Sequence, residues 1–263
     1  MTYFPQLVTG AVSQFPGSKR VLRRTIVNET AGGSTAKLAD PMADAIEWSL
    51  DLEGLTDAEW NALEALFEAV EGRLGVFTFA DPFDNLLRWS EDLTAGAWAK
   101  GAGLAVTTGI ADPLGDTGAG RVTNQGGTAE SIQQTVNGPG WYQYCLSVYA
   151  RSAAPATITL FQSAGAASAS RAFAVGETWK RLEYGAKLST MEETAEFGVT
   201  VEPGATVELF GFQVDAQMGA SRYRKTTARG GVHEEAWFLD DTLTRTAAGP
   251  DDNSSQVRIR AGG

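Results

Sequence analysis

The chain has 263 residues, of which 43% are hydrophobic and 20% are charged, as expected for a folded protein with one large domain or two modest ones. Its single cysteine, Cys145, excludes an internal disulfide, and its single histidine, His233, excludes a zinc site built from three or four cysteine or histidine ligands. A formal net charge of −11 disfavours nucleic-acid binding, because phosphate recognition requires clustered lysines and arginines.

The first residues show no targeting pattern. The start Met1–Gln6 lacks both the charged and the apolar region of a signal peptide, and no apolar run reaches the roughly 18 residues of a membrane helix. We therefore expect a protein that is made in a cytoplasm and does not insert into a membrane. The segment Tyr3–Arg24 is apolar and basic without a clear strand alternation, which predicts an arm that becomes ordered only against a neighbouring copy.

A strand and a helix give the first strong structural signals. Residues 45–52 alternate with a period of two, which predicts a strand with one apolar face. Thr56 and Glu59 then form a capping box, and Gly72 and Gly75 mark the helix end. The spacing between them predicts one amphipathic helix that covers a sheet, through Trp60, Leu63, Leu66, Phe67, Val70 and Leu74. A short strand over 76–79 follows, closed by Asp81-Pro82.

The composition changes near Asn85, where a long stretch rich in Gly, Ala, Ser and Thr begins. Short strands alternate there with Gly and Pro turns, which is typical of a β-sandwich or barrel. We expect these strands over residues 141–150, 157–161, 196–201 and 206–214.

The C-terminal part predicts two further strands, over 237–246 and 256–260, joined by a turn at Ala248–Asn253. A lone hairpin is marginal in water and needs a partner sheet, which the N-terminal part has to supply. We therefore predict a discontinuous domain, residues 1–84 and 228–263, interrupted by an inserted domain over 85–227. The expected fold class is all-β with one amphipathic helix, a discontinuous β-rich domain carrying an inserted β-sandwich or barrel.

The candidate ligand-binding residues of the insert are Trp141, Gln143 and Tyr149. Tyr142 and Tyr144 lie on the more apolar face of the predicted strand and should line the core. The alternation then turns the three candidates to the opposite face, where rings and an amide could contact a sugar. Packing in a core or an interface is the alternative for Trp141, because large aromatics supply most core area.

Other polar clusters favour binding or turns over catalysis. Asp112 and Asp116, in a Gly-rich turn, are candidate calcium ligands, with an Asp-capped turn as the equal alternative. Adjacent acidic pairs such as Glu192 and Glu193 point to opposite faces of a strand. They therefore do not supply the two carboxylates, about 5–10 Å apart, that a glycosidase needs. We predict no catalytic residue, and no cofactor other than this structural calcium ion.

The insert contains, in chain order, the stretches Asn85–Trp98, Ala111–Thr117, Arg121–Thr123, Ile132–Gln134, Tyr144–Arg151, Trp179–Arg181, Leu209–Val214 and Ser221–Tyr223. In these stretches and their order it resembles a carbohydrate-binding-module-like jelly roll that is common in phage tail proteins. The resemblance implies a jelly-roll β-sandwich that serves as an accessory binding or decoration unit, without specifying a ligand.

The flanks contain Phe4-Pro5, Leu55–Glu59, Phe67–Gly75 and Phe77–Pro82, a helix followed by a strand that ends in an aromatic-rich Asp turn. In these stretches they resemble the distal-tail class of tail-tip proteins of long-tailed phages. The class implies a β-rich assembly domain that self-assembles into a ring, usually sixfold, between the tail tube and the baseplate. Its partners would be copies of itself and other tail-tube and tail-tip proteins.

Together these patterns favour a structural, non-enzymatic protein of the virion, assembled in the host cytoplasm at a phage tail tip. The inserted domain would bind a host-surface glycan or only decorate the particle. Two alternatives stay open: a stand-alone carbohydrate-binding protein, and a fragment of a polysaccharide-degrading enzyme.

Overall fold

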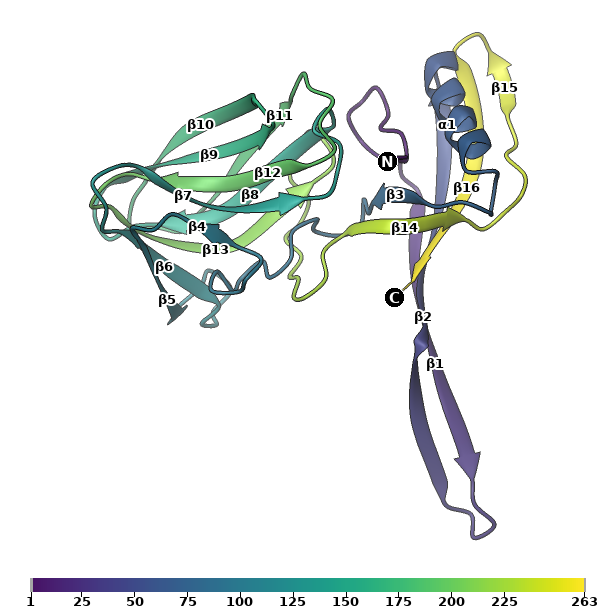
Figure 1. The fold of residues 1–263 in the computed structure, drawn as a ribbon, viewed down its shortest axis with the longest axis horizontal. Coiled ribbons are helices and arrows are strands. Elements are labelled where there is room, and N and C mark those ends of the chain that lie inside the picture. The colour runs from purple at the N-terminus through teal and green to yellow at the C-terminus, as the bar shows by residue number, and fades with distance from the viewer. Residues whose placement is uncertain (1, 263) are drawn as a thin grey trace. The chain divides into compact units, whose positions relative to one another are not determined.

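The computed structural model describes residues 2–262 and contains mostly antiparallel strands with one helix among those residues (Figure 1). The chain divides into two compact units. The first comprises the residues up to Val8, Ser13–Phe79 and the residues from His233 onward, and the second comprises Thr9–Val12 and Ala80–Val232. The boundaries expected from the sequence, at 84/85 and 227/228, lie a few residues from these.

The first unit is built on one six-stranded sheet with the order β1-β2-β16-β14-β3, in which β15 also pairs with β16. The C-terminal strand β16 pairs with the second half of β2, so the last part of the chain completes the sheet begun by the first. The sequence predicts a strand over 237–246. The observed strand, β14, instead begins at Val232 and ends at Phe238. The bounds are β1 Gly17–Glu29, β2 Thr35–Leu55, β3 Phe77–Ala80, β14 Val232–Phe238, β15 Thr246–Gly249 and β16 Asp252–Gly262.

The helix α1 (Asp57–Ala69) covers the apolar face of this sheet. It begins with the predicted capping box, in which the Thr56 hydroxyl accepts from the Glu59 amide and the Glu59 carboxylate accepts from the Thr56 amide. Trp60, Leu63 and Leu66 are buried, as are Trp48, Leu50 and Leu52 of the alternating strand β2. Leu74, predicted on the apolar face, is 78% exposed because the helix has ended and the chain turns at Glu71 and Gly72, both with positive φ.

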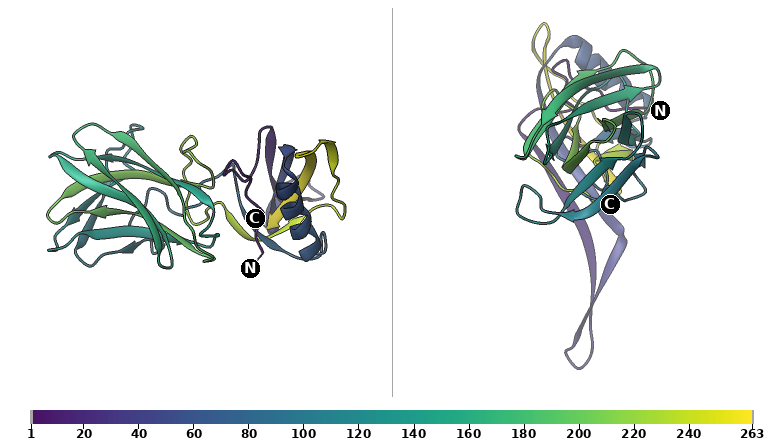
Figure 2. Two further views of the ribbon diagram at one scale, coloured as in Figure 1. Left: turned by 90° about the horizontal axis from the view of Figure 1, so that it is seen from above. Right: turned by 90° about the vertical axis from the view of Figure 1, so that its left-hand side faces the viewer.

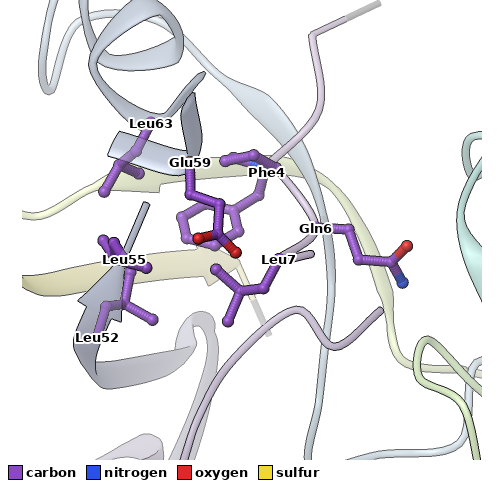
Figure 3. Close-up of a pocket in the computed structure, with 8 residues that line it drawn as sticks. Phe4, Gln6, Leu7, Leu52, Leu55, Glu59 and Leu63 are labelled. Atoms are coloured by element: carbon purple, nitrogen blue, oxygen red, sulfur yellow. The ribbon is translucent and has the colours of Figure 1, made fainter. Parts of the chain in front are cut away.

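The N-terminal segment packs on its own unit. Phe4 is buried, its amide donates to the Thr78 carbonyl, and the Thr78 amide donates to the Thr2 carbonyl. Figure 3 shows the apolar pocket where this segment meets α1 and β2, lined by Phe4, Leu7, Leu52, Leu55 and Leu63. Glu59 also lines this pocket. Its carboxylate accepts a hydrogen bond from the Val8 amide at 2.7 Å and another from the Thr56 amide. The prediction that Tyr3–Arg24 becomes ordered only against a neighbouring copy is therefore wrong, since Phe4 is buried within its own chain and β1 begins at Gly17.

The second unit is a jelly-roll β-sandwich of two five-stranded antiparallel sheets, with the orders β10-β9-β12-β7-β4 and β11-β8-β13-β6-β5. Tyr144 of one sheet meets Phe197 of the other at 5.1 Å between ring centroids, and both rings are buried. The predicted fold class is confirmed. The bounds are β4 Ala99–Lys100, β5 Leu104–Ile110, β6 Ala119–Asn124, β7 Glu130–Val136, β8 Gln143–Arg151, β9 Ala156–Ala164, β10 Ala167–Val175, β11 Lys180–Lys187, β12 Ala195–Val201 and β13 Thr206–Asp215.

The segment 85–98 is fixed to the sandwich through one buried amide side chain. Asn85 is fully buried, and its Oδ1 accepts from the amides of Leu87 and Val214, each at 3.0 Å. Its Nδ2 donates to the carbonyls of Phe212 at 2.8 Å and Arg224 at 3.3 Å. The opening motif of the resemblance thus ties three chain segments together and is structural.

Candidate functional site

The most unusual feature of the first unit is a two-stranded ribbon that extends beyond the sheet. Strand β1 pairs only with β2, and β2 pairs with β16 only from Ala45 onward. Residues 22–44, which we call the arm, therefore have no third strand of residues 2–262 beside them. Figure 2 shows the ribbon from further sides. Every residue from 23 to 39 is exposed. The arm thus has no core of its own.

Apolar side chains lie on this arm without cover. Ile26 and Leu38 form a cross-strand pair and are 38% and 55% exposed, and Val27 and Met42 are exposed to 52% and 94%. A two-stranded ribbon is at best marginally stable in water, and exposed apolar clusters mark interaction sites. The arm is therefore the candidate assembly surface of the first unit.

The structure separates the three ligand-binding candidates of the sequence. Gln143 and Tyr149 lie on β8 and share the face that points away from the core residue Tyr144. Six residues of strand place them roughly 20 Å apart. Trp141 lies in the turn before β8, where the Tyr142 amide donates to the Pro139 carbonyl. Because strand alternation does not set the direction of a turn residue, the argument that placed Trp141 beside Tyr149 does not hold.

Tyr149 belongs to an aromatic cluster on the outer face of its sheet. Its ring lies 6.0 Å from Phe210 and 6.3 Å from Tyr223, and the Arg181 guanidinium lies over it at 5.7 Å. The Tyr223 hydroxyl donates to the Glu91 carboxylate, and burial raises the pKa of Tyr223. The cluster packs the chain after β13 against the sheet. The ligand-binding role of Trp141, Gln143 and Tyr149 stays a prediction.

The carboxylates proposed as calcium ligands form a capped turn. Asp112 accepts from the amides of Leu114 at 2.8 Å, Asp116 at 3.1 Å and Gly118 at 2.9 Å. Burial alone would raise the pKa of Asp112, but these amide donors hold it below its ordinary value. Within residues 2–262, no group of three or more His, Cys, Asp or Glu side chains is placed to hold a metal ion. Calcium binding by Asp112 and Asp116 stays a prediction.

Sequence reasoning missed a polar surface on the other sheet of the sandwich. Phe197 and Val199 of β12 point into the core, so Glu196 and Gly198 lie on the outer face. Register pairs Glu196 with Ser163 of β9, and Gly198 with both Phe161 of β9 and Gln133 of β7. We call these residues the Phe161 face: Gln133, Phe161, Ser163, Glu196 and Gly198.

Hydrogen bonds join the polar side chains of the Phe161 face. The Gln133 amide donates to Glu196 at 3.2 Å, and the Ser163 hydroxyl lies 3.3 Å from the same Glu196 oxygen. A Cβ on Gly198 would come within 2.8 Å of Phe161 Cζ, so the glycine lets the ring lie against the backbone. The result is a half-buried aromatic ring beside an amide, a hydroxyl and a carboxylate. The signal in the sequence is the alternation over 131–135 and 159–163.

The buried thiol and the helix content give no further site. Burial raises the pKa of Cys145 to about 12, which leaves an inert thiol. Within residues 2–262, no helix is long and apolar enough to cross a membrane.

No protein-family model matches the chain, and no curated protein sequence matches it. Solved structures match about half of it. The enzymatically active domain of tailspike protein 4 from bacteriophage CBA120 is 17% identical over 52% of this chain with a TM-score of 0.42, and the match spans only 22% of that domain. The CBM22-1 xylan-binding domain of Paenibacillus barcinonensis Xyn10C is 16% identical over 54% of this chain and 99% of its own, with a TM-score of 0.43.

A third match is TmCBM61 in complex with β-1,4-galactotriose, 17% identical over 49% of this chain and 97% of its own, with a TM-score of 0.38. The strand order of the second unit, rather than these matches, establishes its sandwich fold. None of the three descriptions concerns a distal tail protein.

Proposed function

We propose that the chain is a non-enzymatic subunit of a homo-oligomeric assembly, in which the first unit makes the subunit contacts and the second is an accessory sandwich. The main observation in support of this proposal is the exposure of the arm. Its residues 23–39 are all exposed, and it presents apolar side chains on a ribbon that no third strand from the described part of the chain supports. A neighbouring copy would supply the missing burial.

The resemblance of the flanks to distal-tail proteins makes a ring in a phage tail tip the specific form of this proposal. Residues Leu55–Glu59 form the helix cap, and Phe77–Pro82 form β3 and its turn, where the Phe83 amide donates to Asp81 at 2.8 Å. These residues orient α1 and the sheet edge rather than the arm. The place in the virion, the sixfold number and the tail-tube partners rest on the resemblance alone.

The mass of the chain in solution tests the proposal. Light scattering across a hundredfold range of concentration should give a multiple of 27.9 kDa at the upper end. A single-chain mass at every concentration would refute self-assembly. Negative-stain images of the assembled fraction then distinguish closed rings from other forms.

A second function, glycan binding by the sandwich, is favoured by the Phe161 face. An aromatic ring stacks on the apolar face of a sugar, and amide and carboxylate groups pair with its hydroxyls. This face carries all of these groups on adjacent strands. Glycan binding is compatible with an accessory unit of an oligomer and with a stand-alone carbohydrate-binding protein. The mass measurement distinguishes these two alternatives, because only the first requires self-association.

Two single substitutions compare the Phe161 face with the turn at Trp141. The probes are soluble xylan and β-1,4-galactotriose, named in the descriptions of the similar modules. Phe161→Ala should weaken binding roughly 30-fold, the effect of losing an anchor worth about 2 kcal/mol. Trp141→Ala should leave the affinity unchanged. The matched control is Phe15→Ala, which removes a ring of the first unit that is 86% exposed.

The reverse result, lost binding in Trp141→Ala with an unchanged melting temperature, would move the site to Trp141. Equal affinities in all three variants would remove both sites.

A further inference from the structure

The N-terminal segment passes from the first unit to the second and back again within a few residues. The residues up to Val8 belong to the first unit, Thr9–Val12 belong to the second, and Ser13 returns to the first. We call Thr9–Val12 the strap. It is a connection between the units in addition to the two crossings of the chain at 79/80 and 232/233.

Hydrogen bonds fix the chain to the first unit on both sides of the strap. Just before the strap, the Val8 amide donates to the Glu59 carboxylate at the start of α1, at 2.7 Å. Just after it, the Gln14 side-chain oxygen accepts from the Glu53 amide of β2, also at 2.7 Å. The strap is therefore a short loop whose two ends are anchored on the first unit.

The middle of the strap is packed into the second unit. Gly10 is buried at a φ of +80°, and Val12 is only 1% exposed. A Cβ on Gly10 would lie 2.9 Å from Cγ of Gln143 and 3.3 Å from Cγ of Met218. Only glycine combines this backbone conformation with so close an approach. Gly10 and Val12 therefore hold the strap in place.

We propose that the strap couples the stabilities of the two units, so that they unfold in one cooperative transition. Unfolding of the second unit exposes Gly10 and Val12. Unfolding of the first unit releases both anchors, and the strap then keeps its place only at the cost of additional chain entropy. Each unit is thus more stable while the other is folded, whereas units joined only by exposed linkers unfold independently.

Two substitutions in the full chain release the strap, and each has a matched control. Gly10→Val places a branched side chain at a positive φ and against Gln143. Its control is Gly33→Val, at a φ of +79° where a Cβ meets no atom within 4 Å. Val12→Ser removes a buried apolar side chain, and its control Val8→Ser changes one that is 80% exposed. Because Val12→Ser leaves the backbone unstrained, it keeps the test valid where Gly10→Val prevents folding.

Calorimetry and amide hydrogen exchange measure the effect at a dilution where the chain is single. The parent and both controls should unfold in one transition. Both strap variants should unfold in two, with the lower midpoint about 4 °C or more below that of the parent. After correction for intrinsic rates, the amides of residues 11–13 should exchange at least tenfold faster in the strap variants than in their controls.

Three results would overturn the coupling. The first is a parent chain that already unfolds in two transitions. The second is a single transition in both strap variants although their straps exchange rapidly. The third is exchange in both strap variants as slow as in their controls, which would show that Gly10 and Val12 do not hold the strap. All of these measurements concern single chains, so none of these results bears on self-association, which the mass measurement tests separately.

Discussion

Removal of the arm is expected to abolish self-association while leaving the folded chain intact. Residues 23–44 would be replaced by Asn-Gly, which joins the paired residues Leu22 and Ala45 by a two-residue hairpin turn. Ile26 and Leu38, which share one face of the ribbon, each gain about 1.5 kcal/mol or more on full burial. Losing both should therefore weaken association by about 100-fold or more, at 1.4 kcal/mol per decade.

The melting temperature of the shortened chain should stay close to that of the parent, because no buried side chain lies between residues 23 and 39. Light scattering and calorimetry on the same samples measure both effects. A tip-only variant, with Asn-Gly between the paired residues Val27 and Lys37, keeps Arg23, Ile26 and Leu38 and should lose much less affinity. Unchanged association after full arm removal would place the subunit contacts elsewhere.

The substitution Asn85→Ala should be the most destabilising single change in the sandwich. It leaves two buried amides and two carbonyls without their partner. Each orphaned buried group costs about 1–3 kcal/mol, so we expect a loss of about 4 kcal/mol or more in the free energy of unfolding of the second unit. Chemical denaturation of the variant measures this loss.

The exposed Asn28, changed to Ala, is the control and should alter stability by about 0.5 kcal/mol or less. A loss below about 1 kcal/mol in Asn85→Ala would show that other contacts hold the segment 85–98 on β13.

Features set by local or periodic patterns could be predicted from the sequence. The capping box of Thr56 and Glu59 fixes the start of α1 within four residues, and the alternation around Trp48 follows from one buried sheet face. The arm could not be predicted in this way. Both of its faces are exposed, so its residues show no alternation between apolar and polar positions. Only the pairing of its β1 part with its β2 part makes these residues strands.

The candidate binding residues show where periodicity stops being informative. Tyr144 was placed correctly in the core because β8 alternates from Gln143 onward. Trp141 precedes the strand, in a turn whose geometry depends on the Pro139–Tyr142 hydrogen bond. The Phe161 face depends on which strands are neighbours in the sheet, β9, β12 and β7, and this order follows from long-range pairing that no local pattern encodes.

Amide hydrogen exchange of the arm tests most directly whether another copy covers it. Exchange would be followed in the parent chain at a dilution where light scattering gives single chains and at a concentration where it gives the assembly. An isolated two-stranded ribbon opens readily, so amides of residues 23–39 should exchange rapidly in the dilute sample and at least tenfold more slowly in the assembly, while amides of β16 exchange equally in both. Equal, rapid exchange of the arm in both samples, with the assembly present, would contradict its role as the assembly surface.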